Sequence, residues 1–390
     1  MRRGLNLVAA GFALTALSYG LARFAFGLLL PRIRDDLSLG LTAAGWIGGS
    51  AFLAYCVGII VAFNGIGRVG ARFIALSAGL SASVGMGLVS VASTQWTLGL
   101  GIALAGLSTG LASPPLATAV AARFGDRDSA KANATINAGT AAGIVLAGMA
   151  ALLDVGSWRE VYGVFSLFGV GVTVWLWYAV PPGYTASEHG QRAGANLRRP
   201  GVFALCASAF LMGLASTANW TFGADILRSE FEFSSDRLAW VWLVVGAAGM
   251  SGSLTGMLTN RFGTARIHAL SLLAIACGTL GLTATAFSPA YGFVAMGVFG
   301  AAYIVSSGAL LIRGIELFSD RPDLGLGIPF LSLAIGQSVG TPLFDATLKS
   351  TGSTAALGLF AAAACLAIFI RPGVASAPDV QEAVGRSPTP

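Results

Sequence analysis

One arginine lies deep inside an apolar run near the amino terminus of the chain. Arg23 falls in the stretch SYGLARFAFGLLLPR and precedes Pro31 by about 12 Å of helix. Thr15 and Tyr19 precede it at four-residue intervals, so the three side chains share one helix face. A guanidinium holds a carboxylate, sulfonate or phosphate through two parallel hydrogen bonds. We therefore predict that Arg23, with Tyr19 beside it, binds an anionic substrate.

Two other roles remain open for Arg23. In one, it pairs with a carboxylate or with helix carbonyls and only locks helices together. In the other, its long side chain extends to the membrane surface. Each role needs compensation, because an arginine at the centre of a membrane helix costs at least about 2.5–3.5 kcal/mol by insertion scales.

Other polar and aromatic side chains inside apolar runs are candidates for the same site. Asn219 could hydrogen-bond a ligand and Trp220 could form a flat wall, although a tryptophan there also suits the membrane interface. Tyr303 and Gln337 lie deep in later runs. Asn137 belongs to KANATINAGTAAG, where small residues at four-residue spacing favour close helix packing, so its reach to the site is the less favoured alternative.

The composition indicates an integral membrane protein. Of the 390 residues, 55% are hydrophobic and only 10% are charged, and mean hydropathy is +0.76. A soluble domain carries about 25% charged residues. The first apolar run, which follows two arginines, continues to about Leu30 and is too long for the core of a signal peptide, so we expect a retained membrane helix.

Twelve stretches of membrane-spanning length follow one another along the chain. We expect an N-terminal unit at 1–180, a cytoplasmic linker at 181–200, a C-terminal unit at 201–371 and a disordered cytoplasmic tail at 372–390. The predicted spans are 5–31, 41–63, 73–92, 97–121, 132–153, 161–180, 201–224, 238–258, 267–287, 290–312, 325–346 and 353–370.

The positive charges are distributed unequally between the two sides of these spans. Of the 23 lysines and arginines, sixteen fall in the breaks on one side and six in the breaks on the other, with Arg23 in neither group. The positive-inside rule then places both termini and the linker in the cytoplasm. The net charge of +6 is therefore a topology signal and needs no nucleic-acid partner.

Two short loops repeat one pattern in the two halves of the chain. The loop after the second span reads NGIGRVGAR, and the loop after the eighth reads GMLTNRFGTAR. In each, a glycine supplies a tight turn and arginines remain at the cytoplasmic face. The residues concerned are Arg68, Gly70 and Arg72 in the first copy, and Asn260, Arg261, Gly263 and Arg266 in the second.

This duplicated loop resembles the G-x-x-x-D-R-x-G-x-R-R loop of the major facilitator superfamily. The resemblance covers the whole chain and implies an all-α membrane fold, with twelve helices in two six-helix bundles around a central cavity, and a monomer. The usual aspartate is replaced by Gly67 and Asn260, so the latch that this carboxylate forms must be weaker or built differently here. An arginine common near the start of the fourth helix of drug exporters is Ile102.

The stretch GLARFAFGLLLP is similar to the first helix of a bacterial subgroup classed near cyanate and organic-anion transporters. That similarity implies the bacterial cytoplasmic (inner) membrane. At the cytoplasmic end of the tenth span, Arg313 and Glu316 are predicted to form a gate or interface pair. Asp225, near the outer surface, is expected to be solvated.

We therefore predict a secondary active transporter for a small organic anion, in which two bundles rock about a midplane site. Proton symport and exchange are both open as the driving reaction. The alternatives are an efflux pump for hydrophobic compounds and a membrane receptor or scaffold that transports nothing. No Walker motif or enzyme motif is present, the four cysteines lack CxxC spacing, and both histidines, His189 and His268, fall in predicted loops, so we expect no enzyme activity, cofactor or metal.

Overall fold

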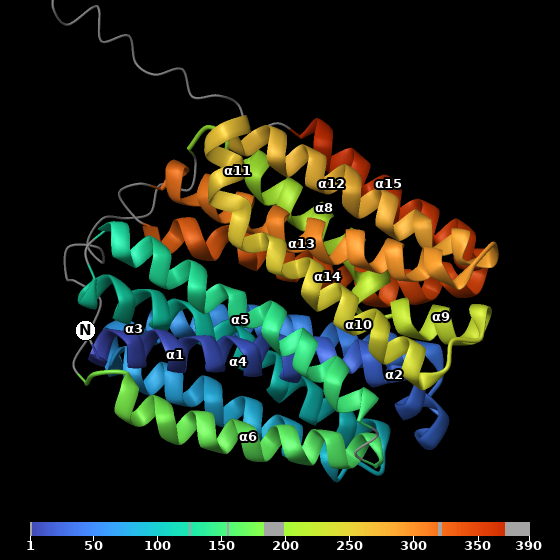
Figure 1. The fold of residues 1–390 in the computed structure, drawn as a ribbon, viewed down its shortest axis with the longest axis horizontal. Coiled ribbons are helices and arrows are strands. Elements are labelled where there is room, and N and C mark those ends of the chain that lie inside the picture. Colours follow the sequence, from blue (N-terminus) through green and yellow to red (C-terminus); the bar gives the residue numbers. More distant parts are fainter. Residues whose placement is uncertain (1, 125, 154–155, 183–198, 319–321, 371–390) are drawn as a thin grey trace, which may run out of the picture.

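The chain folds into long helices that run nearly parallel across the molecule (Figure 1). The computed structural model describes residues 2–124, 126–153, 156–182, 199–318 and 322–370. Most of the predicted linker and all of the predicted tail lie outside the described residues.

The helices up to residue 180 follow the predicted spans closely. Their bounds are α1 Arg2–Thr15, the π-helix η1 Ala16–Phe24, α2 Ala25–Leu37, α3 Leu41–Ser90, α4 Gln95–Arg123, α5 Asp126–Leu152 and α6 Trp158–Ala179.

The helices after residue 200 complete the molecule. Their bounds are α8 Val202–Trp220, α9 Gly223–Phe231, α10 Ser235–Gly249, the 3₁₀-helix η2 Met250–Leu254, α11 Thr255–Phe262, α12 Thr264–Gly281, the 3₁₀-helix η3 Leu282–Ala286, α13 Pro289–Leu317, α14 Pro322–Thr351 and α15 Ser353–Phe369.

The described residues supply the twelve expected passes. Ten of their helices are long and apolar enough to cross a membrane, and Ser353–Phe369 is a shorter apolar helix. The 50-residue α3 is kinked at Gly70 and makes two passes, which brings the total to twelve. The predicted spans therefore match, and the helices mostly extend a few residues beyond the apolar stretches.

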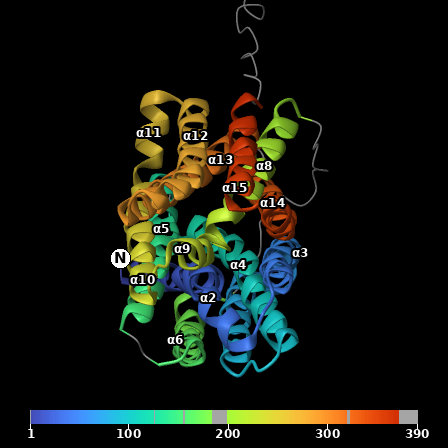
Figure 2. The ribbon, with the colours of Figure 1, turned by 90° about the vertical axis from the view of Figure 1, so that its right-hand side faces the viewer.

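The helices before and after the linker gather into two groups, which Figure 2 shows end-on. The N-terminal half comprises α1 to α6, and the C-terminal half comprises α8 to α15. The halves meet where α2 packs on α9, α3 on α14 and α5 on α10. Each half thus contributes its first helix to the contact between them.

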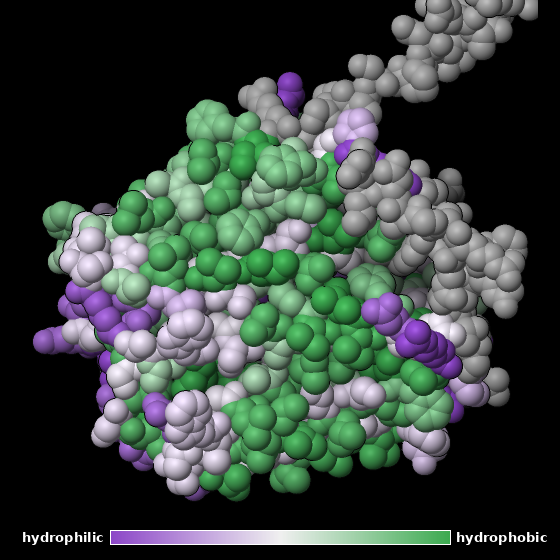
Figure 3. Space-filling view, turned by 180° about the vertical axis from the view of Figure 1, so that it is seen from behind, coloured by the Kyte–Doolittle hydropathy of each residue, from purple (hydrophilic) through white to green (hydrophobic). Residues whose placement is uncertain are grey.

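The surface around the middle of the molecule is apolar. Figure 3 shows hydrophobic residues covering this region, with hydrophilic residues gathered toward the sides of the view. Large apolar side chains of the described residues, such as Leu53, Leu167 and Leu270, are more than half exposed. An exposed apolar band of this size suits contact with lipid chains.

The first span contains an unusual turn. Between α1 and α2, residues Ala16–Phe24 form a π-helix, and the Ala25 N–H donates to the Gly20 carbonyl five residues earlier. Gly20 lies against the backbone of Gly143 in α5, where a β-carbon would come within 2.3 Å. Wide turns of this kind are rare and often accompany functional sites. This one carries both Tyr19 and Arg23.

The two repeated loops have the same backbone geometry. Gly70 has φ 85° and ψ 160°, and Gly263 has φ 88° and ψ 141°. Side chains are strongly disfavoured in this region of backbone space, at a cost of about 1–3 kcal/mol. The chain therefore makes the same turn in both halves, at Gly70 and at Gly263. Arg68 and Arg261 lie beside these glycines, and we call this end of the molecule the arginine-rich face. We call the opposite end, where α2 and α9 meet, the distal face.

We predict that Gly263→Ala lowers the free energy of unfolding by about 1–3 kcal/mol, because no atom lies near the new methyl group and only the backbone is strained. Gly70→Ala is expected to behave alike. Thermal unfolding of the purified protein in detergent measures the change. Gly358→Ala is the control, since Gly358 lies within helix α15 with open space around it. Equal melting temperatures for Gly263→Ala and Gly358→Ala would contradict the prediction.

Candidate functional site

Arg23 is buried at the contact between the two halves of the molecule. Only 6% of the residue is exposed, so its side chain does not extend to the membrane surface. Its Nη2 donates a hydrogen bond to Oε1 of Gln337 in α14. The first helix of one half is thus linked directly to a helix of the other.

Aromatic rings surround the same guanidinium. Its central carbon lies 4.7 Å from the ring centre of Tyr55, 4.8 Å from Phe52 and 4.9 Å from Phe24. Tyr19 lies at 6.0 Å. A cation near a ring face is attracted by the ring quadrupole, by about 2 kcal/mol or more where water is excluded. The rings therefore offset part of the cost of burying the charge.

The charge of Arg23 nevertheless has no counter-charge among the described residues, because the groups around it are all neutral, namely one amide, four rings and the side chain of Tyr303. Its Nε is buried and has no hydrogen-bond partner. A buried ion without an opposite charge is strongly unfavourable. Among the described residues, the guanidinium thus carries a positive charge that no opposite charge balances.

Gln337 connects Arg23 to two further helices. Its Nε2 donates to the hydroxyl of Tyr303 in α13 and to Oγ of Ser216 in α8, both at 3.1 Å. On the other side, the Tyr19 hydroxyl lies 2.9 Å from Oγ of Ser113 in α4. Of the residues predicted from the sequence, Arg23, Tyr19, Tyr303 and Gln337 therefore lie together.

Trp220 joins this cluster, and Asn219 does not. The Trp220 ring stacks on Phe24 with centres 3.9 Å apart and is only 2% exposed, so the membrane-interface alternative for Trp220 is wrong. The amide of Asn219 accepts a hydrogen bond from Thr279 at 2.7 Å and donates to Met296 at 3.5 Å, within the C-terminal half.

The remaining candidates lie away from Arg23. Asn137 is exposed on α5, where the neighbouring Gly139 and Gly143 pack tightly on the backbone of the first span. Arg313 and Glu316 form an ion pair of 3.0 Å at the end of α13. Their role as a gate stays a prediction, because the ion pair joins two residues of the same helix.

Among the loop residues, Arg72 is anchored within its own half. Its guanidinium donates to the Val180 carbonyl and lies 5.6 Å from the ring centre of Trp177. Arg68, Asn260, Arg261 and Arg266 are exposed.

Two expectations about single residues are wrong. His268 does not lie in a loop but in α12, because the helix begins at Thr264, and its ring bridges Ser208 and Ser306 at 2.8 and 2.9 Å. Asp225 is not solvated, because it is only 5% exposed and forms an ion pair with Arg34.

The Arg34–Asp225 pair is one of two ion pairs that join α2 and α9 at the distal face. Asp225 lies in α9 and Arg34 in α2, so the pair joins the two halves. A second, reciprocal pair joins Arg228 of α9 to Asp35 of α2 at 2.6 Å, but it is more exposed. Burial raises the pKa of Asp225, and the charge of Arg34 lowers it.

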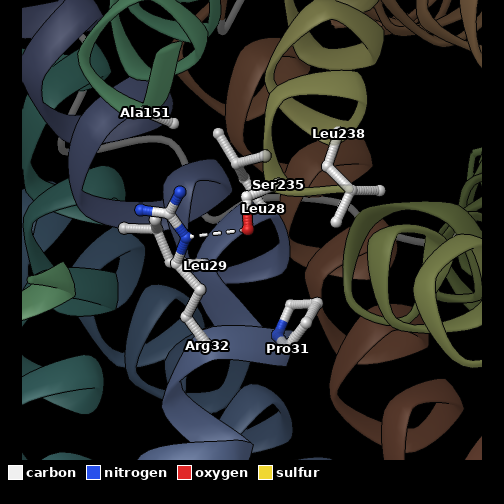
Figure 4. A pocket seen from close by; sticks show the side chains of 7 residues that line it. All are labelled: Leu28, Leu29, Pro31, Arg32, Ala151, Ser235 and Leu238. Atoms are coloured by element: carbon white, nitrogen blue, oxygen red, sulfur yellow. Dashed lines mark hydrogen bonds between the residues drawn. The ribbon is translucent and has the colours of Figure 1, made fainter. Parts of the chain in front are cut away.

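Two further contacts strengthen the same closure. Arg32 of α2 donates to Oγ of Ser235 in α10 at 3.3 Å, beside a small hollow lined also by Ala151 of α5 (Figure 4). Gly27 lies so close to α8 that a β-carbon would come within 1.9 Å of the Trp220 carbonyl oxygen. The distal face is thus closed by charge pairs above and by backbone contact beneath.

Residues 12–341, most of the chain, match the family model of the Major Facilitator Superfamily. The chain belongs to the major facilitator superfamily. Its similarity to solved structures of this superfamily extends over the whole fold. A xylose transporter XylE from E. coli superimposes with a TM-score of 0.77 at 14% identity, covering 94% of this chain and 97% of that one.

Two other superfamily transporters have the same fold. The nucleoside transporter NupG has a TM-score of 0.74 at 13% identity, with 93% of this chain and 98% of that chain covered. A bacterial homologue of the human lysosomal transporter Spinster has a TM-score of 0.69 at 17% identity, with 94% and 92% covered. The chain is also 28% identical over 290 residues to "Transcription regulatory protein OpdE" of Pseudomonas aeruginosa, covering 69% of this chain and 70% of that protein.

Sequence reasoning missed Phe52 and Tyr55 in the Arg23 cluster of this superfamily member. Both lie in the second span, and their three-residue spacing places them on one helix face. That signal alone is typical of ordinary core packing. What distinguishes them is the arginine of another helix, which only the fold brings against them.

We predict that Arg34→Gln opens the distal face at neutral pH, because it leaves the buried Asp225 carboxylate without its cation. The loss corresponds to about 1–3 kcal/mol, or roughly a 5- to 150-fold shift between closed and open forms. Spin labels at Gly40→Cys and Ser229→Cys, both exposed and in opposite halves, measure the separation. Arg228→Gln is the matched control, with an expected effect below about 1 kcal/mol because its pair is more exposed. An equal response of the two variants would refute the assignment.

The opening caused by Arg34→Gln should depend on pH. Without Arg34, burial and the charge of Asp35 raise the pKa of Asp225 in the closed form above that of the hydrated open form, and Arg228, the smallest influence, lowers it. The closed form then binds the proton more tightly, so lowering the pH from about 8 to about 5 favours closure. The same labels should return toward the closed separation at low pH. Arg34→Gln combined with Asp225→Asn should stay closed at both, and a pH response in that double variant would exclude Asp225 as its source.

Proposed function

We propose that the protein is a secondary active transporter of a small organic anion, with Arg23 as the counter-charge. The observation that carries this proposal is the buried guanidinium whose contacts are all neutral. An ion pair with a carboxylate of the protein would have argued for a purely structural role. A carboxylate ligand supplies the missing charge and two acceptor oxygens.

The contact between Arg23 and Gln337 suggests how binding is linked to movement. The amide oxygen of Gln337 is a neutral acceptor, and a carboxylate is a stronger one for the same N–H group. A bound anion therefore competes with Gln337 for the guanidinium and weakens a link between the halves. Gln337 then loses its contact with Arg23 but keeps its hydrogen bonds to Tyr303 and Ser216, which already accept from its Nε2.

We place the arginine-rich face in the cytoplasm and the distal face outside, in the bacterial inner membrane, with both termini cytoplasmic. The excess of arginine and lysine supports this orientation. The protein is then closed to the outside. The xylose transporter structure that it resembles is described as a partially occluded inward open conformation, and alternating access exchanges such a state for one open to the outside.

Two driving reactions suit this site, namely proton symport and exchange of one anion for another. No acidic residue contacts Arg23 among the described residues, so the proton in symport arrives on another group or on the anion itself. Uptake into liposomes with and without an imposed pH gradient distinguishes the two reactions. We propose that a single copy of the chain suffices, with the lipid bilayer and the substrate as its partners.

A second candidate function is regulation by ligand sensing without transport. The similarity to a protein named as a transcription regulator favours it, although the identity is 28%. The Arg23 site would then bind the signal. Efflux of hydrophobic cations is disfavoured, because a positive charge at the centre of the molecule repels them.

We predict that Arg23→Met raises the melting temperature of the ligand-free protein, because it removes a buried charge that no carboxylate compensates. The same variant should lose the stabilisation by small carboxylates and the uptake of these anions. A thermal-shift screen of carboxylates, sulfonates and phosphates on both proteins measures the first two effects. Uptake into liposomes measures the third.

Arg237→Gln is the matched control, because Arg237 is exposed at the start of α10 and should leave binding unchanged. A lower melting temperature for Arg23→Met, with no anion stabilising the wild type, would make Arg23 a structural residue and overturn the proposal. Anion binding without uptake would favour the regulator.

A further inference from the structure

We propose that the anion bound by Arg23 is an aromatic carboxylate, with its ring held between aromatic walls from the two halves. This inference rests on the proposed function, because it names the chemical class of ligand for the same site. It is carried by the rings around the guanidinium and by two buried N–H groups that lack acceptors.

The N-terminal half supplies the first wall. Tyr19 and Phe24 come from the π-helix, and Phe52 and Tyr55 from α3, all within 6.0 Å of the Arg23 guanidinium carbon. Tyr19 and Tyr55 pack edge to face, with ring centres 6.3 Å apart. These side chains and the cation belong to the same half, so they move together when the halves separate.

The C-terminal half supplies the second wall. Trp220 meets Tyr303 at 5.2 Å and Phe299 at 5.1 Å, in both cases nearly edge to face. The two walls touch where Trp220 stacks on Phe24 at 3.9 Å. Separation of the halves therefore parts one stacked pair of rings and exposes an aromatic surface on each side. A planar ring of the ligand restores the lost contact on both sides.

Two donors at this junction lack acceptors. The Nε–H of Arg23 and the Nε1–H of Trp220 are both buried without a hydrogen-bond partner, and each belongs to a residue in contact with Phe24. A buried donor without an acceptor costs about 1–3 kcal/mol. A carboxylate satisfies the first of these donors and neutralises the charge.

The same cluster is poorly suited to a hydroxylated anion. It offers few acceptors, and the hydroxyls already have partners, since the Tyr303 hydroxyl and Ser216 accept from Gln337 and the Tyr19 hydroxyl is bound to Ser113. Several ligand hydroxyls would therefore lose water and compete for these few acceptors. Rings prefer the edge-to-face and offset contacts that these walls offer.

The test compares aromatic and saturated acids of nearly equal size and charge on the full-length protein. Benzoate and phenylacetate are paired with cyclohexanecarboxylate and cyclohexylacetate, and benzamide is the neutral aromatic control. Calorimetry and quenching of tryptophan fluorescence give the dissociation constants. We expect each aromatic acid to bind about tenfold more tightly than its saturated partner, and benzamide not to bind.

Phe52→Leu keeps an apolar side chain of similar size but removes the ring. It should weaken benzoate binding about fivefold and leave cyclohexanecarboxylate unchanged. Thermal unfolding without ligand verifies that the variant is folded, and Phe165→Leu, a buried ring of α6 outside the cluster, is the matched control.

Each outcome decides the matter. Equal affinities for aromatic and saturated acids would overturn the aromatic class and leave the proposed anion transporter intact. Binding of benzamide as tightly as benzoate would overturn the role of Arg23 as counter-charge, and with it both proposals. If neither aromatic acid binds, the aromatic class is wrong. The proposed function is then decided separately by the thermal-shift screen, in which a sulfonate or phosphate that stabilises the wild type but not Arg23→Met would support it.

Discussion

The buried positive charge of Arg23 is the constraint that organises the centre of this protein. A guanidinium inside a membrane protein must be compensated, and within the part of the chain that the structure describes its neighbours are neutral, an amide oxygen and aromatic side chains. Because the amide belongs to the other half of the molecule, the halves are joined at their midpoint by an incomplete interaction. Under the proposed function, an incoming anion supplies the charge that this interaction lacks.

Charges at the distal face are treated differently. Arg34 with Asp225, and Asp35 with Arg228, form reciprocal pairs between α2 and α9. Complete pairing stabilises a closed end, whereas incomplete pairing at Arg23 leaves the centre responsive. One fold thus combines paired charges at the distal face with an unpaired charge at Arg23, and the proposed transport cycle uses both.

Most of the fold could be predicted from the sequence, because long apolar stretches report directly on membrane helices and the repeated glycine loops report on the two-fold design. Arg23, Tyr303 and Gln337 could be found because polar groups are conspicuous in apolar spans. The π-helix and the burial of Asp225 could not, whereas the predicted span 267–287 already contained His268, so its assignment to a loop was inconsistent with that span. Asp225 meets Arg34 across 191 residues of sequence, and nothing local in either segment indicates that partner. The amide of Asn219 accepts a hydrogen bond from Thr279, and nothing in the sequence near either residue indicates this contact.

The contact of Gly27 with the Trp220 carbonyl has a mechanical consequence. Helices whose side chains interdigitate must change rotamers before they part, and each change adds to the barrier. The backbone of Gly27 lies directly against the Trp220 carbonyl without interdigitating side chains, so at this contact the two helices can separate as rigid bodies. The same contact tolerates no side chain, because a single methyl group at position 27 would push α2 and α8 apart and hold the distal face open. The absence of a side chain at Gly27 therefore has two effects: the helices can separate quickly at this contact, and position 27 does not tolerate a larger residue.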